Sequence, residues 1–349
     1  MTRDELLDNI HHGVAVTDLD CKGWDLRGLD LSGAMFERVD FSGAQLAGCS
    51  LEDGTLSNCA FVRSDLSHAR LKDARFFRSR LEAAHLDHAF VQDASFMESV
   101  LDDAVFEGAC LERVAFFKCR MSRMNLRTRR CDRVTVGESQ VDQLDCTGAS
   151  LTFATFFQMD LRQVELSGAR CESSTFMECD LTGQRLAGQE FVLCQFTDSR
   201  MDGVDFSSAV LTQSNFKGAQ LRKANFSGVD ACHTLFPEAD MSDANCSCGR
   251  FDQSIWADAV IERVDFGEAR LPLSVFHRAR CSGANFHGAE LQDADFSHAE
   301  LVDVDMRSAN FLRTRFHRAM QKGARFSGRG GIIENDPDLF KAQAWSDGH

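Results

Sequence analysis

Proline is scarce in this chain, with three prolines among 349 residues. No stretch rich in glycine and serine, and no low-complexity run, occurs before about residue 327. Because segments of these kinds usually mark the linkers between domains, we expect a single domain. Globular chains of this length ordinarily divide, since one compact core stops growing near about 250 to 300 residues. A repeat protein escapes that limit because its core grows in one direction only.

Long apolar runs are also lacking. None approaches the roughly 18 residues that a membrane span needs, and residues 1–13 are too acidic and too poor in apolar side chains for a signal peptide. We therefore expect a soluble protein of the cytoplasm, with no membrane partner. Lys and Arg number 38 against 53 Asp and Glu, a net charge of −15. This balance argues against direct nucleic-acid binding and is compatible with a basic partner or with mimicry of DNA.

Catalytic motifs are the third absence. The sequence contains no G-x-S-x-G, P-loop, H-E-x-x-H or G-x-G-x-x-G pattern. The histidines are scattered, and only His68 and His88 lie twenty positions apart in one row, without a carboxylate or cysteine to complete a metal site. We therefore expect no enzymatic activity, no metal and no cofactor.

A period of five residues organises the chain. Stepping by five from Leu26 to Phe326, without an insertion, every position except Gln321 is apolar or small. The residue two positions earlier is nearly always small, and residues 284–288 show the whole unit: Ala, Asn, Phe, His, Gly. Five matches neither the helical period of 3.6 nor the strand period of two, so the chain must turn a corner in every unit.

A second period, of twenty positions, groups these units into coils. The row of central residues that contains Phe36, Phe76, Phe96 and Phe116 is mostly Phe, whereas a neighbouring row that begins at Phe41 is mostly Leu or another aliphatic residue. Like side chains therefore stack every four units. Four pentapeptides form one coil.

The repeat resembles the pentapeptide-repeat family, in which the central Leu or Phe and the small residue two before it fill a square interior. The resemblance covers residues 24–326 and implies an all-β fold, a right-handed quadrilateral parallel β-solenoid of about 15 coils. It also implies a non-enzymatic surface that binds another protein.

The ends of a solenoid need caps because they would otherwise expose the core. In residues 1–23, the segment Asp4–His12 is predicted to form a short helix that carries Leu6, Leu7 and Ile10 on one face and stops at Gly13. In residues 327–349, a glycine-rich stretch breaks the repeat and Pro337 can begin a last helical turn. This segment is predicted to cap the last coil or to dock on a partner.

The register of the five-residue repeat predicts structural roles for the cysteines and for the aspartates at the corners. Eleven of the 14 cysteines fall at inward positions, as expected of free thiols that fill a core in a reducing compartment. Cys246 and Cys248 form a C-x-C pair, but the first should point inward and the second outward. Aspartates that precede central residues can accept hydrogen bonds from the backbone at the corner. Examples are Asp30, Asp40, Asp65, Asp180 and Asp205.

Apolar residues recur in one outward row, where polar residues are expected. The row reads Phe77, Met97, Phe117, Gly137, Phe157 and Met177. A local bulge that tucks these side chains inward is one interpretation. The other is a hydrophobic strip that binds a partner protein or a second copy of the chain, as in a homodimer. The next row alternates in charge, like a solvated rim, and reads Arg78, Glu98, Lys118, Glu138, Gln158 and Glu178.

A basic run from Lys118 to Arg133 is the second exceptional feature. By row position, Lys118, Arg123 and Arg127 are expected to pair with acids one coil away, whereas other arginines have none there. The predicted anion or partner patch is Arg113, Arg120, Arg129, Arg130 and Arg133. Large or polar residues also replace small inward ones nearby, so we expect an irregular coil around Arg129, because a buried unpaired arginine is very costly. These replacements are Met124, Arg129, Leu144, Met159, Gln184 and Gln189.

Three functions fit these observations. The opening Asp4–Leu7 and Trp24–Ala34 resemble the start of pentapeptide-repeat proteins associated with bacterial type VI secretion, which implies an adaptor for the secretion spike or its effectors. The alternative, from the same family, is an acidic DNA mimic that inhibits or protects DNA gyrase. The third is an interaction domain of a secreted effector.

Overall fold

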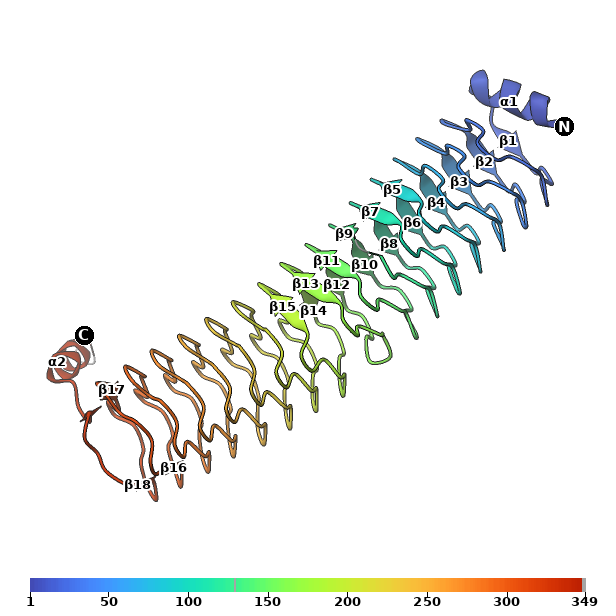
Figure 1. The fold of residues 1–349 in the computed structure, drawn as a ribbon. Coiled ribbons are helices and arrows are strands. Elements are labelled where there is room, and N and C mark those ends of the chain that lie inside the picture. Colours follow the sequence, from blue (N-terminus) through green and yellow to red (C-terminus); the bar gives the residue numbers. More distant parts are fainter. Residues whose placement is uncertain (129, 347–349) are drawn as a thin grey trace. The chain divides into compact units, whose positions relative to one another are not determined.

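The computed structural model describes residues 1–128 and 130–346. The chain divides into two compact units, Met1–Cys179 and Asp180–His349, and both consist of the same kind of parallel β-coil (Figure 1).

The first unit opens with helix α1 (Arg3–His11). Thr2 caps the helix: its side chain accepts a hydrogen bond from the Glu5 backbone, and the Glu5 carboxylate accepts one from the Thr2 backbone at 2.7 Å. Leu6 is fully buried, while Leu7 and Ile10 are partly buried. The helix expected from the sequence is confirmed.

A ladder of parallel strands follows in this unit, and each strand pairs with the residues one coil further along the chain. Its strands are β1 (Val16–Thr17), β2 (Met35–Glu37), β3 (Thr55–Ser57), β4 (Arg75–Phe77), β6 (Ser95–Met97), β8 (Ala115–Phe117), β10 (Thr135–Gly137), β12 (Thr155–Phe157) and β14 (Thr175–Met177). A second ladder comprises β5 (Phe90–Gln92), β7 (Cys110–Glu112), β9 (Arg130–Asp132), β11 (Ser150–Thr152) and β13 (Arg170–Glu172). The repeat ladder reaches back to Val16, which pairs with Phe36.

The second unit continues the same repeat mainly through single parallel bridges, such as Asp205 to Asn225 and Asn225 to Asn245. Its named elements are β15 (Glu190–Val192), β16 (Asp305–Met306), β17 (Thr314–Arg315), β18 (Arg325–Phe326), β19 (Ile332–Ile333) and helix α2 (Pro337–Ser346). Neither helix in the described part of the chain is long and apolar enough to cross a membrane.

The core of each unit is built from the predicted inward rows. In the first unit the rings of Phe76, Phe96 and Phe116 stack with centroids 4.7 and 5.0 Å apart, and all three are buried. In the second unit Trp256 and Phe276 continue the same kind of column. The four-sided parallel β-solenoid predicted from the two periods of the sequence is confirmed.

Corners recur every five residues, and at nearly every one a residue lies in the left-handed region of φ. Glycine occupies many of these positions because it has no Cβ to clash there. The predicted aspartate caps are confirmed: each carboxylate accepts a hydrogen bond from the backbone nitrogen two residues later, at 2.9–3.1 Å. The pairs are Asp30 with Ser32, Asp40 with Ser42, Asp65 with Ser67, Asp180 with Thr182 and Asp205 with Ser207.

The predicted irregular coil lies in the first unit at Thr128. This residue is buried, and its hydroxyl donates a hydrogen bond to the carbonyl of Ala109. Residues in equivalent places elsewhere are corner residues with positive φ, as Gly108 and Gly148 are. Arg129 lies outside the described residues. The irregularity keeps the strand register, because Cys131 still pairs with Leu111, the residue one coil before it.

The cysteines occupy the places that the register assigned. All eleven predicted inward cysteines are buried, Cys248 is exposed, and every cysteine is a free thiol. Burial raises the pKa of Cys49 to about 12 and that of Cys246 well above its usual range. These buried thiols are therefore protonated and unreactive at neutral pH.

A candidate protein-binding surface

The hydrophobic strip forms one continuous outward row in the first unit. Strand pairing places Phe77 beside Met97, Met97 beside Phe117, and Phe117 beside Gly137, and the row continues through Phe157 to Met177. In each of these strands the middle residue points into the core, so the residue after it points out. The side chains come from β4, β6, β8, β10, β12 and β14, which follow one another in Figure 1.

The exposure of these side chains decides whether the row is a bulge that turns them inward or a hydrophobic strip on the surface. Met97 is 43% exposed and Met177 is 38% exposed. The three phenylalanines of the strip are partly exposed rather than buried. A bulge that tucks the side chains inward is absent from these strands, because their middle residues fill the core without a change of register.

The charged row beside the strip forms the expected rim. The Arg78 guanidinium lies 2.8 Å from the Glu98 carboxylate, Lys118 lies 3.6 Å from Glu138, and the Gln158 amide donates to Glu178 at 2.8 Å. Two cations of this rim also cover strip aromatics: Arg78 lies 4.7 Å from the Phe77 ring centroid and Lys118 lies 5.2 Å from that of Phe117. The rim therefore follows the strip closely.

A groove at the N-terminal end of the strip was not predicted. It has a volume of about 390 Å³ and lies on β2, β3 and β4, between Ala15 and Phe77. Met35, which is 44% exposed, lines it. The signal in the sequence was a methionine directly before Phe36, at an outward position of the neighbouring row.

The expectation that the patch arginines lack acidic partners is wrong for the four that the structure describes. Arg113 binds Asp93 at 2.6 Å, Arg120 binds Asp102, Arg130 lies 3.3 Å from Glu112, and Arg133 lies 2.7 Å from Asp132. An arginine side chain is long enough to reach a carboxylate diagonally across the adjacent coil, in a neighbouring row, as well as one in its own row. Any anion at these residues would compete with a carboxylate.

The pairing expected for the rest of the basic run is partly correct. Arg123 binds Asp103 at 2.6 Å and lowers the pKa of that carboxyl, and Lys118 pairs with Glu138. Arg127 binds Asp145 at 2.7 Å rather than Glu107, the acid one coil before it in its own row. The diagonal reach explains this difference as well.

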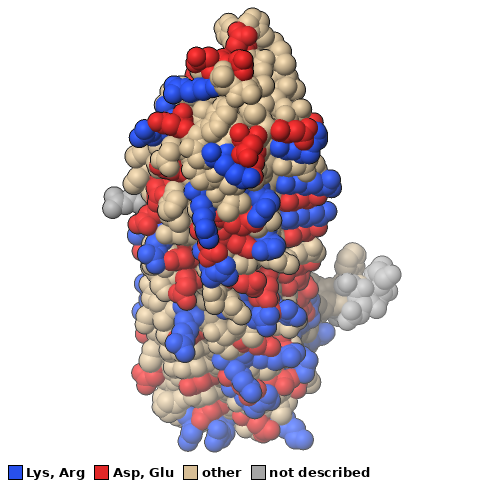
Figure 2. All heavy atoms as spheres, turned by 90° about the vertical axis from the view of Figure 1, so that its right-hand side faces the viewer, with Lys and Arg blue, Asp and Glu red and all other residues tan. Residues whose placement is uncertain are grey.

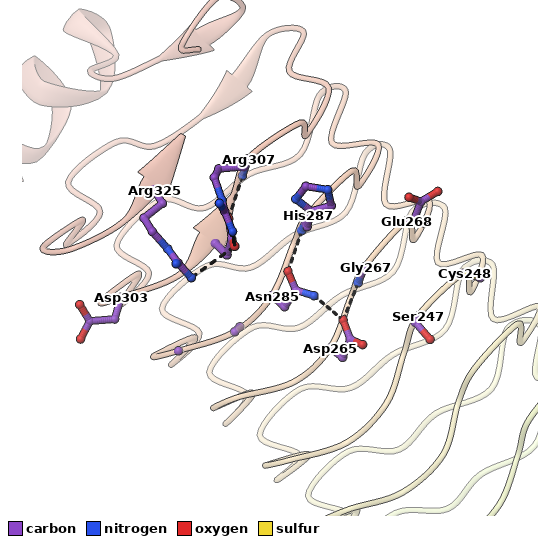
Figure 3. Close-up of a pocket in the computed structure, with 13 residues that line it drawn as sticks. Ser247, Cys248, Asp265, Gly267, Glu268, Asn285, His287, Asp303, Arg307 and Arg325 are labelled. Atoms are coloured by element: carbon purple, nitrogen blue, oxygen red, sulfur yellow. Dashed lines mark hydrogen bonds and ion pairs between the residues drawn. The ribbon is translucent and has the colours of Figure 1, made fainter. Parts of the chain in front are cut away.

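A polar hollow of about 530 Å³ in the second unit gathers several titratable side chains (Figure 3). Two of its carboxylates are held by neighbouring groups. Asp265 accepts hydrogen bonds from the Gly267 backbone at 2.9 Å and from the Asn285 amide at 2.7 Å. Asp305 is held by Arg307 at 2.6 Å, which keeps the pKa of its carboxyl well below its usual range. These carboxylates have the environment of structural groups rather than of a general acid and base.

Histidines gather at two places. His68 and His88 stack with ring centroids 5.2 Å apart, as their spacing of one coil predicted. A group at the C-terminal end was not predicted, because no two of its members lie one coil apart in a row: His277 and His317 share a row but are two coils apart, and His298 belongs to the next row. Among the described residues, no three His, Cys, Asp or Glu side chains are placed to hold a metal ion together.

Charges of both signs are interleaved over the face drawn in Figure 2. Ion pairs between coils account for the mixture, as in Arg263 with Asp243 and Arg278 with Asp258, both at 2.6 Å. The net negative charge is therefore not concentrated into one acidic face in that view.

Family models match most of the repeat. A model described as "Pentapeptide repeats (8 copies)" matches residues 17–53, 44–82, 76–116, 145–183, 257–293 and 289–328. A second, described as "Pentapeptide repeat region", matches residues 169–246. Comparison with curated proteins returns no match.

Several of the solved structures that match this chain are pentapeptide repeat proteins. QnrB1, a plasmid-mediated fluoroquinolone resistance protein, is 18% identical, with 59% of this chain and 100% of that chain covered and a TM-score of 0.38. HetL of the cyanobacterium Nostoc, involved in the regulation of heterocyst differentiation, is 17% identical over 95% of this chain and 99% of that chain, with a TM-score of 0.18. A protein of the Arabidopsis thaliana thylakoid lumen is 25% identical over 36% of this chain and 66% of that chain, with a TM-score of 0.19.

Proposed function

We propose a function from one premise: the chain belongs to the pentapeptide repeat family. It is a protein-binding scaffold without catalytic activity, and its docking surface is the hydrophobic strip from Phe77 to Met177. The observation that supports this proposal is the exposure of phenylalanine and methionine along successive coils, in a row where a solvated repeat carries polar residues.

The chemistry of the strip suits protein recognition. Aromatic rings and methionine are common at the centres of protein interfaces, and the charged rim can exclude water around them. The core does not need these side chains, because each strand fills the interior with its middle residue. Their retention on the surface is therefore best explained by binding.

The more specific role that we propose is an adaptor of a bacterial type VI secretion system, with the spike or an effector as partner and the cytoplasm as location. It is supported by the resemblance of residues 4–34 to the opening of such adaptors. The interaction domain of a secreted effector would use the same strip.

Affinity purification from a native bacterial lysate tests the function, with the wild type beside Phe117→Asp. We expect the variant to lose its partner proteins while its melting temperature changes little, because Phe117 is outside the core. Gln213→Asp, an outward change in the second unit with the same introduced charge, is the matched control. Partners that remain bound to Phe117→Asp would contradict the strip as the docking surface.

The gyrase alternative is supported by the net charge of −15. A DNA mimic presents acidic rows, so its binding to purified gyrase should weaken steeply as salt rises and should survive Phe117→Asp. Figure 2 and the ion pairs between coils favour the strip over this alternative, because arginines neutralise many of the acids.

A further inference from the structure

We propose that the partner that fits the hydrophobic strip is the strip of a second copy, running in the opposite direction. The inference rests on the proposed protein-binding role of the strip and names a second copy, in place of the spike or an effector, as its occupant. A twofold axis parallel to strands β8 and β10, passing between them, would turn the outward face of one copy onto that of the other. Each outward row would then face itself in reverse order.

The apolar row of one copy is complementary to the same row of the second copy in reverse order. With the axis between β8 and β10, Phe77 faces Met177 of the second copy, and Met97 faces Phe157 of the second copy. Each contact joins an aromatic ring to a methionine, and thioether sulfur packs favourably against such rings. By symmetry, each of these contacts occurs twice.

The residues at the centre of the proposed interface, Phe117 and Gly137, also fit a second copy. A side chain at Gly137 would lie 3.3 Å from the Phe117 ring, so that ring already leans over Gly137 toward the axis. The two Phe117 rings of the dimer would therefore meet near the axis, with glycine rather than a bulky side chain beside each of them. An aromatic pair at the middle of the contact is typical of a binding hot spot.

The charged rim of one copy is also complementary to the rim of the second copy in reverse order. In the same register, Arg78 faces Glu178 of the second copy and Lys118 faces Glu138 of the second copy. Between them, Glu98 faces the uncharged Gln158. No two like charges face each other, although the rim contains both signs.

The remaining outward row permits close approach. Along β6, β8, β10, β12 and β14 its residues are Ser95, Ala115, Thr135, Thr155 and Thr175. These five are small and uncharged, so the two faces can approach there to roughly the 10 Å at which β-sheets stack. The β4 member of the row is Arg75, which is exposed and faces Thr175 of the second copy at the edge of the contact.

One register buries the whole strip. Moving the axis to lie between β6 and β8 keeps the rim charges complementary. However, it places Glu37 against Met177 and Ser57 against Phe157. Only the axis between β8 and β10 places all the strip residues against one another.

The test is sedimentation velocity of the purified full chain over a concentration series. We expect a monomer–dimer equilibrium for the wild type. Glu138→Lys should weaken it by about tenfold or more, because two Lys–Lys contacts replace two Lys–Glu contacts. The double variant Lys118→Glu, Glu138→Lys should restore the dimer, because the opposed pair is regenerated with its signs exchanged.

Two controls accompany these variants. Glu268→Lys makes the same charge change at an exposed corner of the second unit and should leave the equilibrium unchanged. Circular dichroism melting should show that all the variants remain folded.

Each other outcome overturns the inference. A wild type that is monomeric at every concentration excludes the dimer. A dimer that persists in Glu138→Lys and in Phe117→Asp uses another surface. A dimer that the double variant fails to restore excludes this register, since in the shifted one the introduced glutamate of Lys118→Glu would face Glu98. Because only the purified chain is present, a monomer here combined with partner loss from lysate by Phe117→Asp would leave the proposed function intact.

Discussion

Neighbouring residues in one strand have different roles in this protein: one fills the core and the next lies on the surface. Phe96 is fully buried between the rings of Phe76 and Phe116, whereas Met97, the next residue, is 43% exposed on the strip. Strand alternation makes this separation possible, because successive side chains point to opposite faces. A change at one position can therefore affect stability alone, and a change at the other can affect binding alone.

Alanine substitutions at these two positions test the separation. Phe96→Ala should reduce the free energy of unfolding by about 3–5 kcal/mol, because it opens a cavity in a stacked aromatic column. Met97→Ala should change it by no more than about 0.5 kcal/mol, because the side chain is already in contact with water. Urea unfolding followed by circular dichroism measures both. Equal losses for the two variants would mean that Met97 belongs to the core.

Among the secondary-structure elements, helix α2 is attached to the last coils by a polar network. Asp336 caps the helix, accepting from the backbone of Leu339 at 3.1 Å. The Gln343 amide lies between two imidazoles: its oxygen is 3.2 Å from Nε2 of His317, and its nitrogen is 3.2 Å from Nε2 of His298. This arrangement requires His317 to donate and His298 to accept, so His298 must be neutral.

The docking of α2 should therefore depend on pH. Burial, together with the nearby His277, His317 and Arg318, lowers the pKa of His298 below its ordinary value of 6.5. The undocked state then binds more protons than the docked state, so docking is stable above about pH 6.5 and weakens as pH falls below it. Hydrogen exchange of residues 337–346, corrected for intrinsic rates, should show less protection at pH 5 than at pH 7.5.

Residues 201–230 contain no histidine and serve as the internal reference for this measurement. Their protection should be the same at both pH values. Gln343→Ala should lower the protection of α2 at pH 7.5 and reduce its pH dependence. Equal protection of α2 at both pH values in the wild type would exclude His298 as the determinant.

A second element depends on one glycine. Gly331 precedes β19 with φ of 87°, and a Cβ there would lie within 2.1 Å of the Phe311 carbonyl oxygen. Gly331→Ala should therefore disrupt the pairing of β19 with β17, which joins Ile332 to Thr314. Gly330→Ala is the matched control, since nothing lies within 4 Å of a Cβ at that position. Hydrogen exchange at residues 332–333 should increase in the first variant only.

Across the whole molecule, the repeat hides almost all of the thiols. Among the 14 cysteines, Cys248 is exposed and Cys110 is partly exposed, and the others are buried. Burial raises the pKa of thiols such as Cys59 to about 11, which further suppresses their reaction.

Titration with a chromogenic disulfide reagent should reflect this distribution. The folded chain should show one fast-reacting thiol and one slower thiol, and the chain in denaturant should show all 14. Cys248→Ser should remove the fast phase and leave the rest unchanged. Fast reaction of several further thiols in the folded chain would contradict the inward placement of the cysteine rows.

Several features of the fold and of the strip could be predicted from the sequence, because each depends on a local rule that repeats. The five-residue phase determined which residue of each unit points inward, as it did for Phe96 and Cys246. The corner position determined that Asp40 and Asp65 would bind backbone nitrogens. The coil period was enough to place Phe77, Met97 and Phe117 in one row.

The ion pairs, the groove and the C-terminal network could not be predicted in this way. Arg120 and Arg130 bind carboxylates of a neighbouring row because long side chains reach diagonally across coils, which a comparison within single rows does not test. The docking of α2 brings Gln343 to His317 and His298 across a break in the repeat.

The coil, its core and the row that became the strip therefore follow from the order of residues alone, because periodicity and the alternation of side chains along a strand specify them. The choice of ion pairs, the exposure of the strip and the attachment of α2 were settled by folding in three dimensions. These outcomes depend on the distances between side chains of adjacent coils, and the order of residues along the chain does not specify those distances.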